Sequence, residues 1–495
     1  LLVKIDGKFH AIGGKCSHFG GPLAEGLLHD HIVRCPWHQA CFDVLTGEHK
    51  EPPALDDLPH FDLKIEEDNV IAIIPDDAKQ QIVPKMVKRD PSNKETFIIV
   101  GAGSAGNSSA EALRQNGFDG RIIMATREKL LPYDRTSLSK GYLKSDNSNP
   151  PLLRSADFYS DYDIEALTEH EVTGIDSTSK SVTFSNGISM RYDKLLLATG
   201  SIPRRTNVPG ADLENIFTLR TPVDADKIKS LAKKGSKAVV IGSSFIGMET
   251  SANLIDRGVS ITIVALDAVP FEQILGTEIG NMYKSLHEEK GTTFRLSSKI
   301  ARFEGDKKVQ TVVLESGEKL PADFVILGIG VQPATGFLKG FDLNPDGSLN
   351  VDKHFMVKDY IYAVGDIANF EYWYTSERIR IEHWRLAEQH GRIAAQNMAG
   401  KEAEYHSIPF FWTNQLGVGL KYIGYTRGWD EIIFQGSPAK RDFIAFFVKK
   451  GQISAVTGCG KTLPFLASAE LMQKNQMPTV DEIRKGPVDM VKRLK

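Results

Sequence analysis

The spacing of apolar and polar positions changes twice along the chain. Up to residue 75, short apolar runs at 2–5, 32–33 and 70–74 alternate with clusters of glycine, proline and aspartate. This pattern predicts short strands joined by turns. Residues 76–94 are polar and keep no sustained period. We therefore expect a small all-β domain followed by a linker.

From residue 96 onward, each apolar run leads directly into a segment with helical composition. Residues 97–100 form a continuous apolar run, and 110–116 continue as a helix. The same unit recurs with an apolar run at 238–241 and a helical segment at 248–256. Strands that alternate with helices predict a parallel sheet with crossover helices. Two α/β units are therefore expected.

Further apolar runs, within 195–200, 326–333 and 362–366, each end in small residues. Beyond residue 407, aromatic strand-like runs such as 443–448 mix with a helical segment at 465–474. The final part of the chain is therefore expected to be an α+β domain, and the whole chain a multi-domain protein.

Length and composition limit the function further. A chain of 495 residues is too long for one core and predicts three or four domains of about 150 residues each. A net charge of −3 creates no field that favours nucleic acid, so we expect no nucleic-acid partner. No run of about 18 apolar residues occurs, so no membrane span is expected.

The four cysteines form no disulfide framework, which favours a reducing compartment. We expect an intracellular protein, either cytoplasmic or mitochondrial. The chain starts at Leu1 without methionine, so residues in front of it, and any targeting segment among them, are expected to be missing.

Two short motifs near the N-terminus combine thiol and imidazole groups. Cys16 is followed by His18, and Cys35 by His38. Two cysteines and two histidines can also hold tetrahedral zinc, but zinc fingers pair like with like. A two-iron cluster with two cysteine and two histidine ligands fits the mixed pairs better. The motifs favour an iron–sulfur cluster, with structural zinc as the alternative.

Glycine-rich turns follow the first strand of each α/β unit. Gly101, Gly103 and Gly106 follow the first apolar run, and Gly242 and Gly247 follow the second. In this context, glycines allow a tight turn and a close approach of the backbone to a pyrophosphate at the helix N-terminus. Two such units suggest two dinucleotides.

These motifs carry a family resemblance. Residues 16–23 and 35–38 resemble the Rieske [2Fe–2S] signature. The landmarks from 95 to 495 resemble flavin-dependent pyridine nucleotide oxidoreductases, in which a nicotinamide domain is inserted into an FAD domain. The combination resembles the Rieske-containing branch of the apoptosis-inducing-factor-like flavoproteins. The resemblance implies FAD, NAD(H) with NADP(H) not excluded, and a [2Fe–2S] cluster.

The resemblance also implies the domain boundaries. The expected segments are a Rieske domain at 1–78, a linker at 79–94, the first part of the FAD domain at 95–221, the NAD domain at 222–350, the second part of the FAD domain at 351–405, and a C-terminal interface domain at 406–495. In such families the last domain often dimerises, so a homodimer is a possible assembly.

Metal ligands follow from the same resemblance. It assigns Cys16 and Cys35 to a buried iron, and His18 and His38 to an exposed iron. The loops lack the extra cysteine pair of high-potential Rieske proteins, which implies a low-potential cluster.

The flavin and nicotinamide contacts are implied in the same way. Residues 132–140 resemble the family's PYDRPxLSK run, with Thr136 in place of proline. The expected catalytic residues are Lys140, Glu249, His383 and Trp412. The expected cofactor-binding residues are Gly101, Gly103, Gly106, Arg135, Lys140, Thr199, Gly200, Asp366, Gly242, Gly247, Glu249 and Gly330.

Departures from the family pattern affect nucleotide binding. Ser244 stands where a glycine is usual, and Ala265 replaces the acid that binds a ribose hydroxyl. No arginine for a 2′-phosphate stands there either, so NADH is only preferred over NADPH. No C-x2-C or C-x4-C pair occurs, which excludes a disulfide reductase.

The function implied is transfer of electrons from NADH through FAD to the Rieske cluster and then to an unidentified one-electron acceptor. A flavin fits between the two because it takes a hydride pair and releases single electrons. Two alternatives are kept. One is a redox-sensing interaction protein with slow turnover, and the other is an NADH oxidase with a structural cluster.

Overall fold

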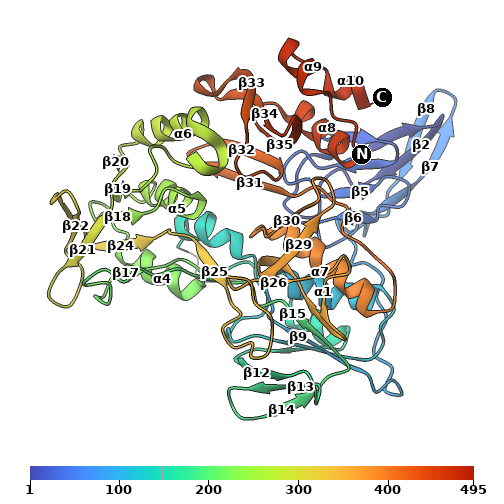
Figure 1. Cartoon of the computed structure of the whole chain (residues 1–495). Coiled ribbons are helices and arrows are strands. Elements are labelled where there is room, and N and C mark those ends of the chain that lie inside the picture. The colour runs from blue at the N-terminus through green and yellow to red at the C-terminus, as the bar shows by residue number, and fades with distance from the viewer. Residues whose placement is uncertain (147–148, 495) are drawn as a thin grey trace.

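The computed structural model describes residues 1–146 and 149–494 (Figure 1). An N-terminal β domain lies beside the C-terminal domain, and the second α/β unit lies on the opposite side of the molecule. This arrangement confirms the multi-domain prediction of a small β domain, an α/β part and a C-terminal α+β domain. None of the helices in the described ranges is long and apolar enough to cross a membrane.

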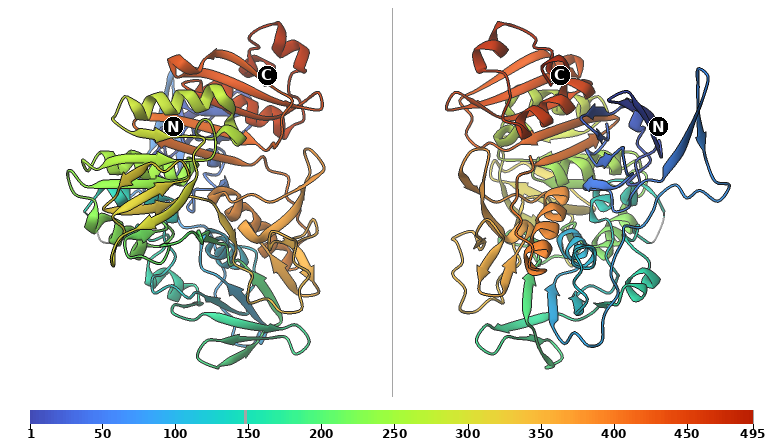
Figure 2. Two further views of the ribbon diagram at one scale, coloured as in Figure 1. Left: turned by 60° about the vertical axis from the view of Figure 1, so that its left-hand side comes forward. Right: turned by 90° about the vertical axis from the view of Figure 1, so that its right-hand side faces the viewer.

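The N-terminal β domain consists of two four-stranded antiparallel sheets, β1-β2-β7-β8 and β3-β4-β5-β6. The β7–β8 hairpin projects away from the body of the molecule (Figure 2). Cys16 lies in the connection between the two sheets and Cys35 in the turn between β4 and β5, and both side chains are part of the domain core. The strands are β1 (Leu2–Ile5), β2 (Lys8–Ile12), β3 (Leu27–His29), β4 (Ile32–Arg34), β5 (Cys41–Asp43), β6 (His49–Glu51), β7 (His60–Glu66) and β8 (Asn69–Ile73).

The first α/β unit is built on a six-stranded sheet in the order β11-β10-β9-β15-β28-β27, parallel except for β27. Its inner strands β10, β9, β15 and β28 are almost wholly buried, which explains their continuous apolar runs. Its elements are β9 (Thr96–Val100), α1 (Ser104–Gln115), β10 (Arg121–Ala125), β11 (Ile164–Leu167), β15 (Lys194–Leu197), β27 (Met356–Lys358), β28 (Ile361–Ala363) and α7 (Trp384–Met398).

Helices α1 and α7 lie side by side in close contact. A Cβ atom at Gly391 would lie only 2.4 Å from the carbonyl oxygen of Ala105, so this approach requires glycine. The hydroxyl of Ser108 donates a hydrogen bond to the carbonyl of Glu388 across the same contact. A late segment of the chain therefore packs against the helix that follows the first glycine-rich turn.

The second α/β unit has a wholly parallel sheet in the order β17-β24-β18-β19-β20. It is inserted between β15 and β28 of the first unit, as the chain order requires. Its elements are β17 (Ile216–Phe217), α4 (Pro222–Leu231), β18 (Lys237–Ile241), α5 (Phe245–Ile255), β19 (Ser260–Val264), α6 (Glu272–Glu288), β20 (Thr293–Arg295) and β24 (Phe324–Leu327).

Small sheets and short helices complete the two α/β units. The remaining elements are α2 (Gly141–Lys144), α3 (Ala156–Asp161), β12 (Val172–Asp176), β13 (Ser181–Phe184), β14 (Ser189–Arg191), β16 (Ser201–Pro203), β21 (Ile300–Glu304), β22 (Thr311–Leu314), β23 (Lys319–Pro321), β25 (Val331–Pro333), β26 (Leu349–Asn350), β29 (Ala368–Tyr372) and β30 (Glu377–Ile379).

The C-terminal domain is an antiparallel sheet, β31-β32-β35-β34-β33, with helices packed against it. The first strand, β31, reaches the centre of the molecule, where it contacts both α5 and α7. The elements are β31 (Phe410–Gln415), β32 (Val418–Gly424), β33 (Glu431–Ser437), β34 (Asp442–Lys449), β35 (Gln452–Cys459), α8 (Thr462–Gln473), α9 (Val480–Lys485) and α10 (Met490–Leu494).

Buried ion pairs dock the N-terminal β domain against the rest of the chain. Arg154 donates to Asp56 of the β domain at 2.6 Å and to Glu111 of α1 at 2.8 Å. Arg34 donates to Glu470 of α8 through its Nε at 2.9 Å. Buried charges that lose a partner are strongly destabilising. These contacts anchor the domain to the first α/β unit and to the C-terminal domain.

Candidate redox site

A cavity of about 610 Å³ lies where the two α/β units and β31 meet. Its volume is in the range of a typical ligand site. The cavity wall includes 11 of the 14 expected catalytic and cofactor-binding residues, whereas Gly106, Gly242 and Gly247 lie outside it. Those in its wall are Gly101, Gly103, Arg135, Lys140, Thr199, Gly200, Glu249, Gly330, Asp366, His383 and Trp412.

The first glycine-rich turn has the shape expected for a pyrophosphate cradle. Gly101 has φ +108°, and a Cβ atom there would lie 2.2 Å from the carbonyl oxygen of Ala198. A Cβ atom at Gly106 would lie 1.9 Å from the carbonyl oxygen of Gly101, whereas Gly103 faces open space. The first and third glycines are therefore required by the fold, and the middle one leaves room for a ligand at the N-terminus of α1.

The second turn repeats this geometry. Gly242 has φ +103°, and a Cβ atom there would lie 2.3 Å from the carbonyl oxygen of Gly328. A Cβ atom at Gly247 would lie 2.5 Å from the carbonyl oxygen of Gly242. The hydroxyl of Ser244 donates to the carbonyl of Gly328 at 3.1 Å. Ser244 is thus used to close the turn.

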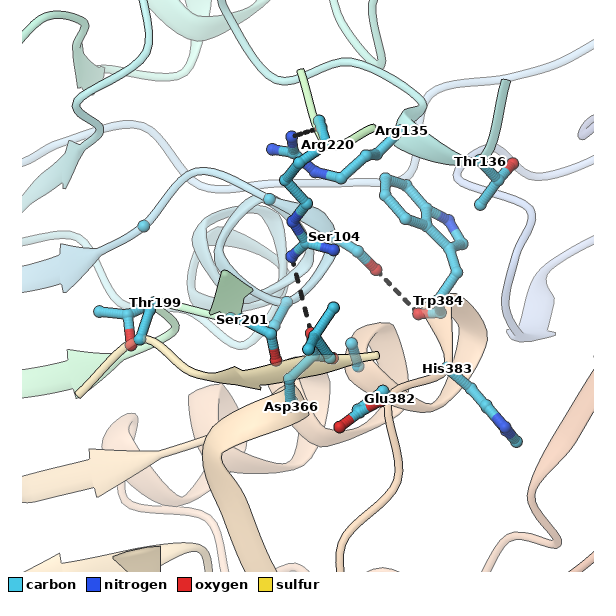
Figure 3. Close-up of a pocket in the computed structure, with 18 of the residues that line it drawn as sticks. Ser104, Arg135, Thr136, Thr199, Ser201, Arg220, Asp366, Glu382, His383 and Trp384 are labelled. Atoms are coloured by element: carbon cyan, nitrogen blue, oxygen red, sulfur yellow. Dashed lines mark hydrogen bonds and ion pairs between the residues drawn. The ribbon is translucent and has the colours of Figure 1, made fainter. Parts of the chain in front are cut away.

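An ion pair and two hydroxyl groups without protein partners among the described residues face the same cavity (Figure 3). Asp366 lies 3.6 Å from Arg220, and both point toward the turn that carries Thr199 and Ser201. Within the described residues, the buried hydroxyl oxygens of Thr199 and Ser201 have no hydrogen-bond partner. Buried polar atoms are normally satisfied, so these atoms fit contacts to a polar ligand such as the FAD pyrophosphate and ribityl chain.

Arg135 is engaged by the protein itself. Its guanidinium donates to Glu128 at 2.6 Å, to the hydroxyl of Tyr133 at 2.6 Å and to the carbonyl of Arg220 at 2.6 Å. The predicted phosphate contact of Arg135 stays a prediction. Arg220, which sequence reasoning did not select, presents its own guanidinium to the cavity beside Asp366.

The predicted pair of Lys140 and Glu249 is present. Lys140 Nζ lies 3.0 Å from Glu249 Oε2, although the two residues are far apart in sequence. Glu249 is only 3% exposed, and it also accepts a hydrogen bond from Ser139 Oγ at 2.7 Å. A charge-assisted pair at the wall of the cavity is therefore fixed by a buried carboxylate.

A hydrogen-bond chain from the C-terminal domain reaches the other oxygen of Glu249. Thr413 Oγ1 donates to Glu249 Oε1 at 2.7 Å, and Gln415 Nε2 donates to Thr413 Oγ1 at 3.0 Å. Gln415 Oε1 lies 3.0 Å from Nε2 of the buried His287. The chain runs from α6 through β31 and fixes the orientation of the carboxylate.

His383 and Trp412 lie in the cavity wall, as predicted. Burial lowers the pKa of His383 to about 3, so its imidazole is neutral. Its Nδ1 has no partner among the described residues, and its ring packs on Phe411 with centroids 4.7 Å apart. The indole of Trp412 packs on the imidazole of His38 in the N-terminal β domain, with ring centroids 4.3 Å apart. Trp412 therefore lies between the cavity and that domain.

The four predicted metal-binding side chains come together at the edge of the β domain. The Nδ1 atoms of His18 and His38 are 3.2 Å apart, a separation that one metal ion with metal–nitrogen bonds of about 2 Å can bridge. Burial lowers the pKa of His18 to about 4 and that of His38 to about 3, and neutral imidazole is the form that binds metals.

The two thiols of the same loops are in contact. A hydrogen bond with Cys16 lowers the pKa of Cys35 to about 7, while the same contact and burial raise the pKa of Cys16. Across residues 1–146 and 149–494, no group of three or more His, Cys, Asp or Glu side chains is arranged to hold one metal ion. A thiol pair beside an imidazole pair fits a two-iron cluster with two protein ligands on each iron.

Family models match almost the whole chain. Residues 95–391 match pyridine nucleotide-disulphide oxidoreductase, residues 1–62 match the Rieske [2Fe-2S] domain, and residues 410–494 match the reductase C-terminal domain. The chain belongs to the pyridine nucleotide-disulphide oxidoreductase family and carries a Rieske domain in front. It is an FAD-dependent NAD(P)H oxidoreductase with a [2Fe–2S] cluster, of the ferredoxin-reductase-like, electron-transferring kind.

The relatives place the chain more narrowly. It is 39% identical to apoptosis-inducing factor 3 of Mus musculus, over 96% of this chain and 81% of that protein. It is 32% identical to putidaredoxin reductase of Pseudomonas putida, over 76% of this chain and 92% of that protein. Among solved structures, a covalent putidaredoxin reductase–putidaredoxin complex matches with a TM-score of 0.76 and 30% identity, over 81% of this chain and 98% of that one. The predicted resemblance to Rieske-containing, apoptosis-inducing-factor-like flavoproteins is confirmed.

Proposed function

We propose that the protein passes electrons from NADH through FAD to its own Rieske cluster, and from there to a one-electron acceptor. The contact between Trp412 and His38 carries this proposal, because Trp412 lines the cavity that fits the flavin and also packs on a residue of the cluster loops. The resemblance to putidaredoxin reductase supports it, since that enzyme is named as the reductase of a separate protein, putidaredoxin, and a covalent complex of the two is among the similar structures.

FAD supplies the conversion between a hydride pair and single electrons when it is bound. We assign to Lys140 a fixed positive charge at the cavity wall, and to Glu249 the positioning of that charge at 3.0 Å. Asp366, Thr199 and Gly200 are assigned to the ribityl and phosphate part of the site. His383 is assigned a neutral ring that excludes water from the inner wall.

The nicotinamide nucleotide is assigned to the second glycine-rich turn. Gly242 and Gly247 form the tight turn that leads into α5, and Gly330 lines the cavity. Buried Ala265 follows β19 where other family members carry an acid, so no carboxylate selects the ribose 2′-hydroxyl there. NADH is the preferred donor because the residues directly after β19 include no arginine for a 2′-phosphate, and Arg295 on the neighbouring strand is paired with Glu318 at 2.8 Å.

The cluster is assigned to the two cysteine–histidine loops. Cys16 and Cys35 would hold one iron of the cluster, and His18 and His38 would hold the other; the ring of His38 packs on Trp412. The one-electron acceptor is assigned to the edge of the β domain that carries His18 and His38. Phe19 is 53% exposed there and packs beside both imidazoles.

Rapid mixing of the full-length protein with NADH under anaerobic conditions tests the route. Flavin bleaching and cluster reduction are followed together in the native protein, Trp412→Leu and the matched control Trp412→Phe. Cluster reduction in Trp412→Leu is expected to slow at least about tenfold relative to flavin bleaching, because the aromatic contact is lost. In Trp412→Phe the relative rate should be largely retained. The route is wrong if cluster reduction in Trp412→Leu keeps pace with bleaching.

A further inference from the structure

A lysine from the C-terminal domain reaches into the cluster loops. Lys421 lies in β32, and its Nζ donates a hydrogen bond to the carbonyl oxygen of Pro36 at 2.5 Å. Pro36 follows Cys35 directly in the second cluster loop. The side chain therefore crosses the boundary between the domains and ends beside the cysteine side of the site.

The charge of this lysine has no counter-ion nearby. None of the described residues offers Lys421 a carboxylate within ion-pair distance, and its ammonium donates to the neutral carbonyl of Pro36. Burial lowers the pKa of Lys421, whereas the neighbouring thiols of Cys35 and Cys459 act to raise it. A half-buried ammonium without a carboxylate acts over a longer range than a surface cation, because less solvent screens it.

We propose that Lys421 is a positioning residue that raises the reduction potential of the Rieske cluster. Adding one electron makes a cluster more negative, and a nearby fixed cation stabilises that form more than the oxidised form. The hydrogen bond to Pro36 also fixes the loop that carries Cys35 and keeps the charge at a constant distance. This inference rests on the proposed function only in assigning Cys35 to the cluster.

The proposal explains why the tuning group belongs to the flavoprotein part. Lys421 lies on the strand next to β31, which carries Trp412, so the residue that contacts His38 and the cation beside Cys35 are fixed by the same sheet. A cluster docked on this sheet is easier to reduce than the same cluster away from it. The docked position therefore favours acceptance of an electron from the flavin side.

Redox titration of the intact protein with dithionite and chemical mediators, followed by low-temperature EPR, measures this effect without NADH. The variants are Lys421→Gln, which keeps a donor but removes the charge, and Lys421→Arg, which keeps the charge. Lys440→Gln is the matched control, because Lys440 is an exposed lysine of the same domain. The EPR g-values of each variant report whether the cluster and its ligands are intact.

Lys421→Gln is expected to shift the equilibrium toward the oxidised cluster at least about tenfold, or about 59 mV for a one-electron couple. Lys421→Arg and Lys440→Gln should stay close to the native protein. The proposal is overturned if Lys421→Gln titrates like the native protein with unchanged g-values, or if Lys421→Arg shifts as far as Lys421→Gln. Since the titration uses no NADH, an unsuccessful electron route from NADH would leave this result unchanged.

Discussion

Thr413 fixes the orientation of the carboxylate that holds Lys140, so replacing Thr413 by valine should slow reduction of the flavin. The change removes the hydroxyl that donates to Glu249 Oε1 at 2.7 Å and leaves the side chain nearly the same size. Glu249 is buried, so water does not replace the lost donor. The ammonium of Lys140 then loses its fixed position at the cavity wall.

The magnitude follows from the type of hydrogen bond. A hydrogen bond to a charged group contributes about 1.5–3 kcal/mol, and each 1.4 kcal/mol corresponds to about a factor of ten in rate. If the whole contribution is expressed at the transition state for hydride transfer, the rate constant falls about 10- to 100-fold in Thr413→Val. Affinity for NADH should change less, because neither Thr413 nor Gln415 is among the residues that line the cavity.

Anaerobic stopped-flow mixing with NADH measures the effect as the first-order rate constant of flavin bleaching at saturating NADH. Thr413→Ser retains the hydroxyl and should recover most of the native rate. Native bleaching rates in Thr413→Val would refute the positioning role. Equal losses in the valine and serine variants would show that packing, and not the hydrogen bond, is responsible.

Other predictions concern the interface and the cluster. Arg154→Met leaves Asp56 and Glu111 as unpaired buried charges, so it should lower the free energy of unfolding by about 3–5 kcal/mol in urea, followed through cluster absorbance. The control Arg127→Met removes an exposed arginine that lies 3.8 Å from Glu171, and it should change the free energy of unfolding by less than about 1 kcal/mol. Equal losses in free energy of unfolding for the two variants would contradict the claim that the buried ion pairs of Arg154 hold the β domain in place. Cys35→Ser should abolish the EPR signal and most bound iron while flavin bleaching by NADH persists. Retention of the full iron content would remove Cys35 from the ligand set.

Local motifs were predictable because their geometry depends on neighbouring residues. The mixed cysteine–histidine pairs predicted that Cys16, His18, Cys35 and His38 meet, and they lie together at the edge of the β domain. The glycine at 101 was also predictable, since a turn with φ +108° strongly favours glycine. In both cases a short run of sequence specifies the shape.

Other parts of the site depend on tertiary packing. Thr413 and Gln415 lie in the polar second half of β31, and nothing in that strand indicates that Glu249 of α5 will face it. From the sequence alone, Lys421 is expected to be an exposed lysine of a strand. Its contact with Pro36 depends on the position of the N-terminal β domain. Arg220 lies shortly after β17, a strand of two residues that is too short to show a pattern. Such residues can be identified as part of the site only from the folded structure or from an alignment of relatives.

The central claim is that NADH reduces the fused cluster through the flavin. An anaerobic titration of the full-length protein with NADH, sampled by low-temperature EPR at each addition, tests it most directly. A rhombic signal of the reduced Rieske cluster should grow with added NADH after the flavin absorbance begins to bleach. Complete bleaching without that signal, in a protein whose cluster is reduced by dithionite, would contradict the claim.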